Sequence, residues 1–353
     1  MKYKKLGKTG LEVSQISFGG IRLGNLSQEK VTELIDDAID QGMNYIDTAR
    51  VYGTSEPKVG QALADIGKRE EVIISSKIIN RDLTTFKSDF NTILDNLQTD
   101  YLDILFMHDI STKKEWKQVN QENIFEYVKK EKDKGRVKHL GISTHNLDLG
   151  EEMLKSGKFE VVMVAYNVSN TEAETGIIPL AKSQDMGIVI MKPYGGGIFT
   201  EAGSKELGFE IKAEESLRFA ASHPDISTVI PGLDKMEYVD TAVKVGKSDI
   251  SLTEEEKGKL IEKVNIKSEH YCRGCEYCLP CPQDIEIPKL LSLYNRHEAF
   301  QGINWSQLHM IEEEYEEVEI KADFCIDCGQ CEESCPYSLP VSDLMDEIVE
   351  KIG

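Results

Sequence analysis

The sequence predicts a (β/α)8 barrel followed by a small, mainly helical domain, and three observations support this fold class. Eight short apolar segments alternate with longer amphipathic segments over about 250 residues, the usual size of such a barrel. Polar residues follow most of these apolar segments, and all eight cysteines lie between Cys272 and Cys335. We therefore predict a barrel at residues 1–255, a linker helix at 256–267 and a second domain at 268–353.

The eight apolar segments have the length and composition of strands that are buried on both faces. They are Ser17–Gly19, Tyr45–Ile46, Val72–Ser76, Ile104–Met107, His139–Ile142, Val161–Ala165, Ile188–Met191 and Thr228–Ile230. Helical spacing of apolar residues lies between them, for example at Glu29–Gln41, Phe86–Leu97, Ile124–Lys134 and Glu214–Ser222. A doubly wound sheet is the main alternative, but no G-x-G-x-x-G follows the first strand.

Before the first barrel strand, the segments Tyr3–Leu6 and Leu11–Val13 are joined through Gly-Lys-Thr-Gly. Two short apolar segments with a glycine-containing turn are typical of a β-hairpin. We expect this hairpin to cover the bottom of the barrel.

Composition and charge restrict the class of protein. No stretch approaches the roughly 20 apolar residues of a membrane helix, and the first residues lack the apolar segment of a secretory signal. These features predict a cytoplasmic protein without a membrane partner. Net charge is −21, of which residues 268–353 contribute −14. Nucleic acid is disfavoured because phosphate binding needs clustered Lys and Arg. The acidic tail is either an ordinary solvated surface or a docking face for a basic redox partner.

The cysteines form two runs of four. The first run is Cys272, Cys275, Cys278 and Cys281, followed by Pro282, and the second is Cys325, Cys328, Cys331 and Cys335, followed by Pro336. This spacing resembles bacterial-type ferredoxin motifs, in which three cysteines ligate one 4Fe–4S cluster and the fourth ligates the other. The resemblance implies one cluster on Cys272, Cys275, Cys278 and Cys335. It implies a second cluster on Cys325, Cys328, Cys331 and Cys281.

Three other interpretations of the cysteines are weaker. A disulfide framework requires an oxidising compartment, and a structural zinc site uses pairs of C-x2-C rather than triplets. Free structural thiols would not be confined to two dense runs. The first run has two residues before its last cysteine, where the ferredoxin pattern has three. Helical spacing at Ile287–Phe300 and Trp305–Val318, between the runs, indicates a helical ferredoxin-like module.

Polar residues at the ends of the predicted strands are the candidate site. They are Asp47, Lys77, His108, Ser143, Asn167, Lys192 and Pro231-Gly232, with Tyr52 five residues after Asp47. All strand ends of a barrel open on one face, where active sites form. A single Asp or His at a strand end is more often a turn or cap residue. Ionisable groups at three consecutive strand ends are better explained by catalysis.

These residues have the chemistry that carbonyl reduction requires. A carbonyl that receives hydride needs a proton donor, and Tyr52 supplies one although the pKa of a tyrosine is ordinarily about 10. Lys77 would lower that pKa towards neutral pH, and Asp47 would keep Lys77 charged and in place. His108 would hydrogen-bond the carbonyl oxygen and orient it.

Three motifs make this region similar to a known family. Asn44-Tyr45-Ile46-Asp47-Thr48-Ala49 with Tyr52-Gly53, then Ser75-Ser76-Lys77, then Leu105-Phe106-Met107-His108 resemble the aldo-keto reductases. The similarity covers roughly residues 1–250. Together with the cysteine runs, the chain resembles the branch of that family that carries a 4Fe–4S dicluster domain.

The resemblance implies a nicotinamide cofactor, NADP or NAD, across the mouth of the barrel. Ser143 and Asn167 match residues that hold the carboxamide, and Lys192, Pro193 and Gly195 match the loop over the pyrophosphate. Gly232 and Lys235 match the segment near the adenosine phosphate. Lys235 is the only basic residue after Gly232 there, so the choice between NADP and NAD stays open. The other histidines are better explained by structural roles, and His145, two residues after Ser143, is the one that could instead reach the site.

The sequence thus predicts an NAD(P)-dependent oxidoreductase that interconverts a carbonyl and an alcohol, with Tyr52 as general acid/base and two 4Fe–4S clusters for electron transfer. Its partners would be a small carbonyl or alcohol substrate and a redox protein of the flavoprotein or ferredoxin type. Two alternatives remain. The protein would be a redox-sensing subunit that binds NAD(P) without turnover, or an electron-transfer module with the barrel as scaffold.

Overall fold

The computed structural model describes residues 1–206, 210–265, 272, 278–300, 305–335 and 339–353. The chain divides into two compact units. The first unit consists of Met1–Gly195 with Lys212–Leu260, and the second consists of Gly196–Ile211 with Ile261–Gly353. The predicted linker helix at 256–267 corresponds to α11 (Glu254–Asn265), and its last two residues lie outside the described part.

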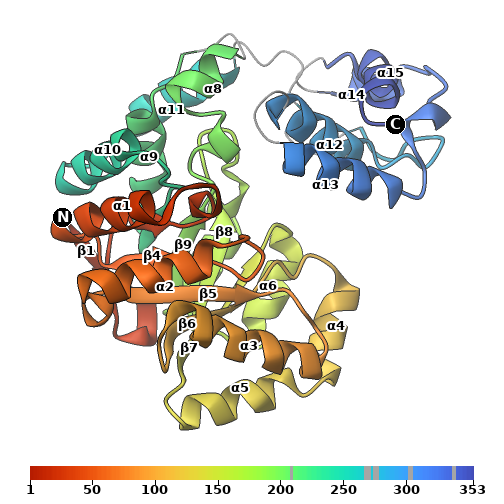
Figure 1. Cartoon of the computed structure of the whole chain (residues 1–353). Helices are drawn as coiled ribbons and strands as arrows, with labels where there is room; N and C mark the ends of the chain where they lie inside the picture. The colour runs from red at the N-terminus through yellow and green to blue at the C-terminus, as the bar shows by residue number, and fades with distance from the viewer. Residues whose placement is uncertain (207–209, 266–271, 273–277, 301–304, 336–338) are drawn as a thin grey trace. The chain divides into compact units, whose positions relative to one another are not determined.

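Parallel strands form the centre of the first unit (Figure 1). They are β3 (Phe18–Gly19), β4 (Tyr45–Asp47), β5 (Ile73–Ile78), β6 (Leu102–Met107), β7 (Val137–Thr144), β8 (Val161–Ala165), β9 (Gly187–Met191) and β10 (Thr228–Ile230). Each strand pairs with the next in chain order. The ring closes where the N–H of Ser17 donates to the carbonyl of Val229 and that of Gly19 to the carbonyl of Pro231, both at 2.9 Å. The predicted (β/α)8 barrel is confirmed.

Helices surround these strands (Figure 1). In the first unit they are α1 (Gln28–Asp40), α2 (Ser55–Ile66), α3 (Leu83–Leu97), α4 (Lys113–Gln121), α5 (Ile124–Asp133), α6 (Leu147–Lys155), α7 (Ile177–Ser183), α9 (Ala213–Ala221) and α10 (Met236–Lys247). Apart from α4, each of these helices has a buried apolar side, as Val31, Leu34 and Ile35 show in α1. That side covers the barrel, as the periodicity of the sequence indicates.

The connection between β6 and β7 contains two helices, where the sequence analysis identified one. The additional helix, α4, is mostly polar and buries only Val119, so apolar periodicity does not reveal it. Its start is nevertheless encoded by a capping box. The N–H of Glu115 donates to Thr112 Oγ1 at 3.2 Å, and the N–H of Thr112 donates to Glu115 Oε2 at 2.9 Å. The spacing T-x-x-E was the available signal.

The N-terminal hairpin is confirmed as β1 (Tyr3–Lys5) paired antiparallel with β2 (Glu12–Ser14). Its turn contains the short helix η1 (Gly7–Thr9), which contacts the chain just before β9, and the N–H of Lys8 donates to the carbonyl of Asp185 at 2.6 Å. Gly7 has φ +50°, and a Cβ there would lie 2.3 Å from the carbonyl carbon of Met186. Glycine is therefore required for the hairpin to cover the amino ends of the strands.

In its described part, the second unit is helical. It contains α8 (Glu201–Glu206), α12 (Ile287–Phe300), α13 (Trp305–Glu316), the short helix η6 (Ala322–Phe324), α14 (Gln330–Ser334) and α15 (Val341–Lys351). Its core includes Leu290, Tyr315 and Ile348. The two helices predicted between the cysteine runs are α12 and α13. Among the described helices of the whole chain, none is both long enough and apolar enough to span a membrane.

Candidate active site and candidate cluster site

The four predicted catalytic residues lie at the carboxyl ends of neighbouring strands. Asp47 is the last residue of β4, Lys77 is the penultimate residue of β5, and His108 directly follows β6. Tyr52 lies in the loop between β4 and α2. Because parallel neighbours place their carboxyl ends together, three strands and one loop bring these side chains to the same end of the barrel.

Lys77 and Asp47 form a buried ion pair. Lys77 Nζ donates to Asp47 Oδ2 at 2.5 Å and to the carbonyl of Thr48 at 2.8 Å. The two residues are only 1% and 5% exposed. The second oxygen of Asp47 accepts a hydrogen bond of 2.6 Å from Ser75 Oγ. A buried pair with its remaining groups satisfied in this way holds one geometry.

Tyr52 and His108 complete the cluster around Lys77. Lys77 Nζ lies 5.0 Å from the centre of the Tyr52 ring. The rings of Tyr52 and His108 meet edge to face, with centroids 6.0 Å apart and planes at 85°. The structure thus brings all four predicted catalytic residues together.

The pKa of Tyr52 differs from the expectation that Lys77 would bring it towards neutral pH. Burial raises the pKa of Tyr52, and the charge of Lys77 opposes this without cancelling it. For Lys77 itself, burial lowers the pKa, but Asp47 and Tyr52 outweigh burial and raise it. The pair at neutral pH is therefore a protonated tyrosine beside a charged lysine, which suits proton donation.

His108 is held neutral. Burial, reinforced by the charge of Lys77, lowers the pKa of His108 to about 3. Its Nδ1 is buried and has no hydrogen-bond partner among the described residues. Buried polar atoms are normally paired, so an unpaired nitrogen beside Tyr52 is consistent with a site that receives an oxygen from a ligand.

The residues predicted to hold the nicotinamide carboxamide lie at the next strand ends. Ser143, the penultimate residue of β7, accepts a 2.9 Å hydrogen bond from the N–H of Asp109. Asn167, two residues after β8, donates from Nδ2 to the carbonyl of Lys192 at 3.0 Å. Asn167 Oδ1 also accepts from the N–H and the hydroxyl of Ser169 at 3.1 and 3.2 Å, and Ser143 Oγ donates to the carbonyl of Met107 at 3.5 Å. Both side chains therefore also hold loops at the mouth.

The loop after β9 contains residues with left-handed backbone. Lys192 and Gly195 both have φ +55°, and Pro193 lies buried between them. Gly195 is in a conformation that glycine adopts without strain, and backbone without a Cβ leaves room for a pyrophosphate. The residues present therefore fit a dinucleotide.

Two basic residues lie near Gly232: Lys235, which was predicted, and Arg22, which was not. Lys235 is exposed at the start of α10, with Nζ 5.8 Å from the ring of Tyr238. Arg22, from the loop after β3, pairs with Asp234 at 3.7 Å. A Cβ on Gly232 would lie 3.9 Å from Arg22 Cγ. Arg22 is 210 positions before Gly232, so only barrel closure brings it there.

Two further side chains support the catalytic set. Ser75 faces Asp47, as shown above, and its alternation with Lys77 along β5 was a usable signal because residues i and i+2 share a face of a strand. Asp109 follows His108 and pairs with His145, with Oδ1 2.8 Å from Nδ1. The ring of His145 therefore contacts Asp109, and a role for it in the site stays a prediction.

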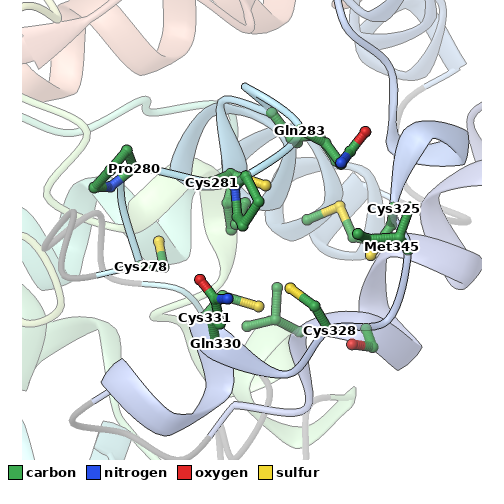
Figure 2. Close-up of a pocket in the computed structure, with 15 residues that line it drawn as sticks. Cys278, Pro280, Cys281, Gln283, Cys325, Cys328, Gln330, Cys331 and Met345 are labelled. Carbon is green, nitrogen blue, oxygen red and sulfur yellow. The ribbon is translucent and has the colours of Figure 1, made fainter.

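The second candidate site is a pocket lined by cysteines from both runs (Figure 2). Cys281 lines it together with Cys325, Cys328 and Cys331, and Cys278 also contributes. The remaining lining includes Ile285, Val341 and Met345, and the pocket has an empty volume of about 410 Å³, including its open side. Thiols in apolar surroundings are the donor set of an iron–sulfur cluster, so these residues fit such a group.

Two of the pocket thiols, those of Cys325 and Cys331, are held in the protonated form by burial when no metal is bound. Burial raises the pKa of Cys331 to about 11, and burial also raises the pKa of Cys325. Cluster assembly must therefore displace protons from them. No three acidic, His or Cys side chains among the described residues are placed to bind one metal ion. A cubane is larger than an ion, so its ligands lie further apart than those of one ion.

The other predicted cluster is only partly described. Cys272 and Cys335 are half-buried against the core of the second unit, and the carbonyl of Cys272 accepts a 2.8 Å hydrogen bond from Asn295. Cys275 lies outside the described residues. The division of the eight cysteines between two clusters therefore stays a prediction.

Comparison with known proteins gives a family match for each of the two regions of the chain. Residues 15–216 match the aldo/keto reductase family, and residues 271–340 match a 4Fe–4S dicluster domain. Aldo-keto reductase YhdN of Bacillus subtilis is 28% identical over 229 residues, covering 60% of this chain and 67% of YhdN. A probable voltage-gated potassium channel subunit beta of Arabidopsis thaliana is 26% identical, covering 69% of this chain and 90% of the subunit.

A similar solved structure is that of aldo-keto reductase AKR11C1 from Bacillus halodurans in its holo form. It superposes with a TM-score of 0.65 at 25% identity. The alignment covers 75% of this chain and 96% of that protein.

Proposed function

Because the chain belongs to the aldo/keto reductase family and carries a 4Fe–4S dicluster domain, we propose that it interconverts a carbonyl and an alcohol with NAD(P). The observation that supports this most is the arrangement of Tyr52 and His108 around the Lys77–Asp47 pair at the barrel mouth.

In the reducing direction, the Tyr52 hydroxyl donates its proton to the carbonyl oxygen. Lys77 stabilises the tyrosinate that remains, and Asp47 holds Lys77 charged and in position. Neutral His108 orients the oxygen by a hydrogen bond. When bound, a nicotinamide supplies or accepts hydride and 4Fe–4S clusters carry single electrons. In the oxidising direction the Tyr52 oxygen takes the proton back.

The cofactor would be held by the residues that the resemblance implies, namely Ser143, Asn167, Lys192, Pro193, Gly195, Gly232 and Lys235. Ser143 and Asn167 would bind the carboxamide, while the backbone around Gly195 would approach the pyrophosphate. Arg22 adds positive charge close to Gly232, on the side where an adenosine phosphate would lie. Titration with NADPH and NADH separately tests which nucleotide is preferred.

The test of the acid/base role is Tyr52→Phe, assayed with NADPH and NADH on a panel of aldehydes and ketones. Loss of a general acid lowers kcat/KM by about 10²–10⁴-fold, while nucleotide binding measured by fluorescence stays unchanged. Tyr101→Phe is the matched control because it removes a hydroxyl that bonds Glu70 outside the site. Equal turnover by Tyr52→Phe and the unsubstituted protein would exclude this mechanism.

For the second domain we propose two 4Fe–4S clusters on the eight cysteines, with Cys272, Cys275, Cys278 and Cys335 on one and Cys281, Cys325, Cys328 and Cys331 on the other. Anaerobic purification should give about eight iron and eight sulfide ions per chain. Cys328→Ser should remove the contents of one cluster, whereas Ser334→Ala, in the neighbouring helix α14, should leave iron content unchanged. Retention of full iron by Cys328→Ser would contradict the ligand set.

A second candidate function is a redox-sensing subunit that binds NAD(P) without turnover. The similarity to a potassium channel subunit beta favours it, because that relative is named for its assembly rather than for a reaction. Nucleotide binding with no turnover of any carbonyl or alcohol in the panel would support this alternative over the enzyme.

A further inference from the structure

Exposed apolar side chains gather beside the cysteine pocket. Leu279, Phe324 and Ile326 are 40%, 58% and 58% exposed. Ile326 lines the pocket, and the other two adjoin Cys278 and Cys325, which also line it. In the described part of the second unit, the other large exposed apolar side chain is Val349 at 38%, and it does not line the pocket.

This grouping needs an explanation beyond ordinary surface composition. Single exposed apolar residues are common. Here three of them lie in or directly next to the lining of one pocket, and Phe324 and Ile326 are only two positions apart in one stretch, which indicates a binding surface. The second unit has a core of its own, with Leu290 and Ile348 fully buried. Phe324 and Ile326 belong instead to the short stretch that also carries Cys325.

Acidic residues surround the same stretch. Asp323 precedes Phe324 and Asp327 follows Ile326, and both are exposed. Asp327 Oδ1 lies 3.6 Å from Cys325 Sγ. The nearest lysine in sequence, Lys321, pairs with Glu316 at 2.6 Å. An apolar centre with a charged rim is the usual composition of a transient protein interface, and here the rim is negative.

Solvent reaches the pocket on this side. Cys328 is exposed, whereas Cys331 is buried. A cluster held here would have one ligand at the surface, beside Ile326. Electron exchange between proteins requires a close approach of the two centres, and this surface offers it.

We propose that Leu279, Phe324 and Ile326 with Asp323 and Asp327, the apolar–acidic face, dock a basic one-electron carrier protein that exchanges electrons with the cluster in the pocket. The inference rests on the proposed clusters. In each encounter one electron leaves a reduced cluster, which is oxidised, and enters the carrier, which is reduced. No bond forms or breaks, and no proton moves.

The test uses the whole holoprotein and a basic c-type cytochrome as the probe. Iron content and the electron paramagnetic resonance spectrum of the reduced protein are measured first. The reduced protein is then mixed with the ferric cytochrome in a stopped-flow instrument at increasing salt. The second-order rate constant should fall about tenfold between low and physiological salt, because salt screens steering by opposite charges.

Two matched pairs of variants locate the surface. Ile326→Ser should lower the rate about tenfold, and Val349→Ser, an equivalent change outside the pocket, should leave it within about twofold. Asp323→Lys should lower the rate more than Glu350→Lys, although both change the net charge equally. A small neutral quinone needs no docking surface, so its reduction should be the same in Val349→Ser, Asp323→Lys and Glu350→Lys. For Ile326→Ser, which changes the pocket lining, iron content and the electron paramagnetic resonance spectrum are the controls.

Two results would overturn the proposal. In the first, a protein with full iron content reduces the cytochrome at a rate that changes neither with salt nor with the Ile326→Ser substitution. In the second, Ile326→Ser slows the reduction of the clusters by NADPH but leaves cytochrome reduction unchanged. The second result would mean that this face contacts the barrel of the same chain rather than a carrier protein. A protein without iron would instead disprove the proposed clusters, and the docking proposal with them.

Discussion

The barrel site and the cysteine pocket hold their reactive side chains in opposite ways. In the barrel, Lys77 and Asp47 are buried, fixed by several hydrogen bonds and placed on paired strands. In the second unit, Cys325 and Cys328 lie in loop backbone, and Cys328 is exposed. In the barrel, contacts between the protein's own side chains fix the geometry of the site. In the cysteine pocket, the bound group would fix the positions of its ligands.

The largest effect should follow from breaking the barrel's ion pair. Lys77→Met leaves Asp47 charged and buried without its partner, which should lower the free energy of unfolding by about 3–5 kcal/mol. Carbonyl turnover should fall about 10²–10⁴-fold. Chemical denaturation and steady-state kinetics measure the two effects.

The double variant Asp47→Asn/Lys77→Met separates stability from chemistry. It removes both charges, while the amide oxygen introduced at position 47 can still accept the hydrogen bond from Ser75. The double variant should therefore recover most of the stability and none of the activity. If the double variant were as unstable as Lys77→Met, the unpaired charge of Asp47 would not be the cause of the lower free energy of unfolding.

Removal of iron should affect only the second unit. Chelation under anaerobic conditions should make the cysteine segments of residues 272–335 the first sites of limited proteolysis, since their loops lose the group that fixes them. The barrel fragment should persist, and its thermal midpoint should stay constant. Reconstitution with iron and sulfide is the control and should restore protection. Early cleavage within the barrel would show that its order also depends on the clusters.

A smaller effect is expected where the ends of the barrel sheet meet. A Cβ on Gly19 would lie 2.4 Å from the carbonyl oxygen of Pro231, so Gly19→Ala should destabilise the protein by about 1–3 kcal/mol. Gly258→Ala is the matched control, because Gly258 lies in α11 with no atom within 4 Å of its Cβ position. It should stabilise by about 0.5–1 kcal/mol. Denaturation midpoints should therefore move in opposite directions.

The smallest effect concerns pH. Since the pKa of His108 is lowered to about 3 and that of Tyr52 is raised, neither group titrates near neutral pH. The kcat/KM for carbonyl reduction should be flat from about pH 5 to 8 and fall only as Tyr52 deprotonates at alkaline pH. Alcohol oxidation, which needs the deprotonated form, should rise over the same alkaline range. An inflection near pH 6.5 that disappears in His108→Gln would contradict the neutral imidazole.

Some residues of the candidate active site could be predicted from the sequence, and others could not. Asp47, Lys77 and His108 could be found because parallel strands place their carboxyl ends together. Arg22 could not be assigned to Gly232, because no local pattern relates residues that only barrel closure brings together. The direction in which the pKa of Tyr52 shifts could not be predicted from the sequence either, since it depends on how far packing buries the ring.

The sequence by itself determined the number and order of the barrel strands, the hairpin before them, and the concentration of cysteines in the tail. These are properties of short segments, set by periodicity and residue type. Tertiary structure alone decided that burial raises the pKa of Tyr52, that His108 stays neutral, and that Arg22 lies beside Gly232. Those outcomes depend on burial and on contacts between distant residues, which arise only when the chain has folded.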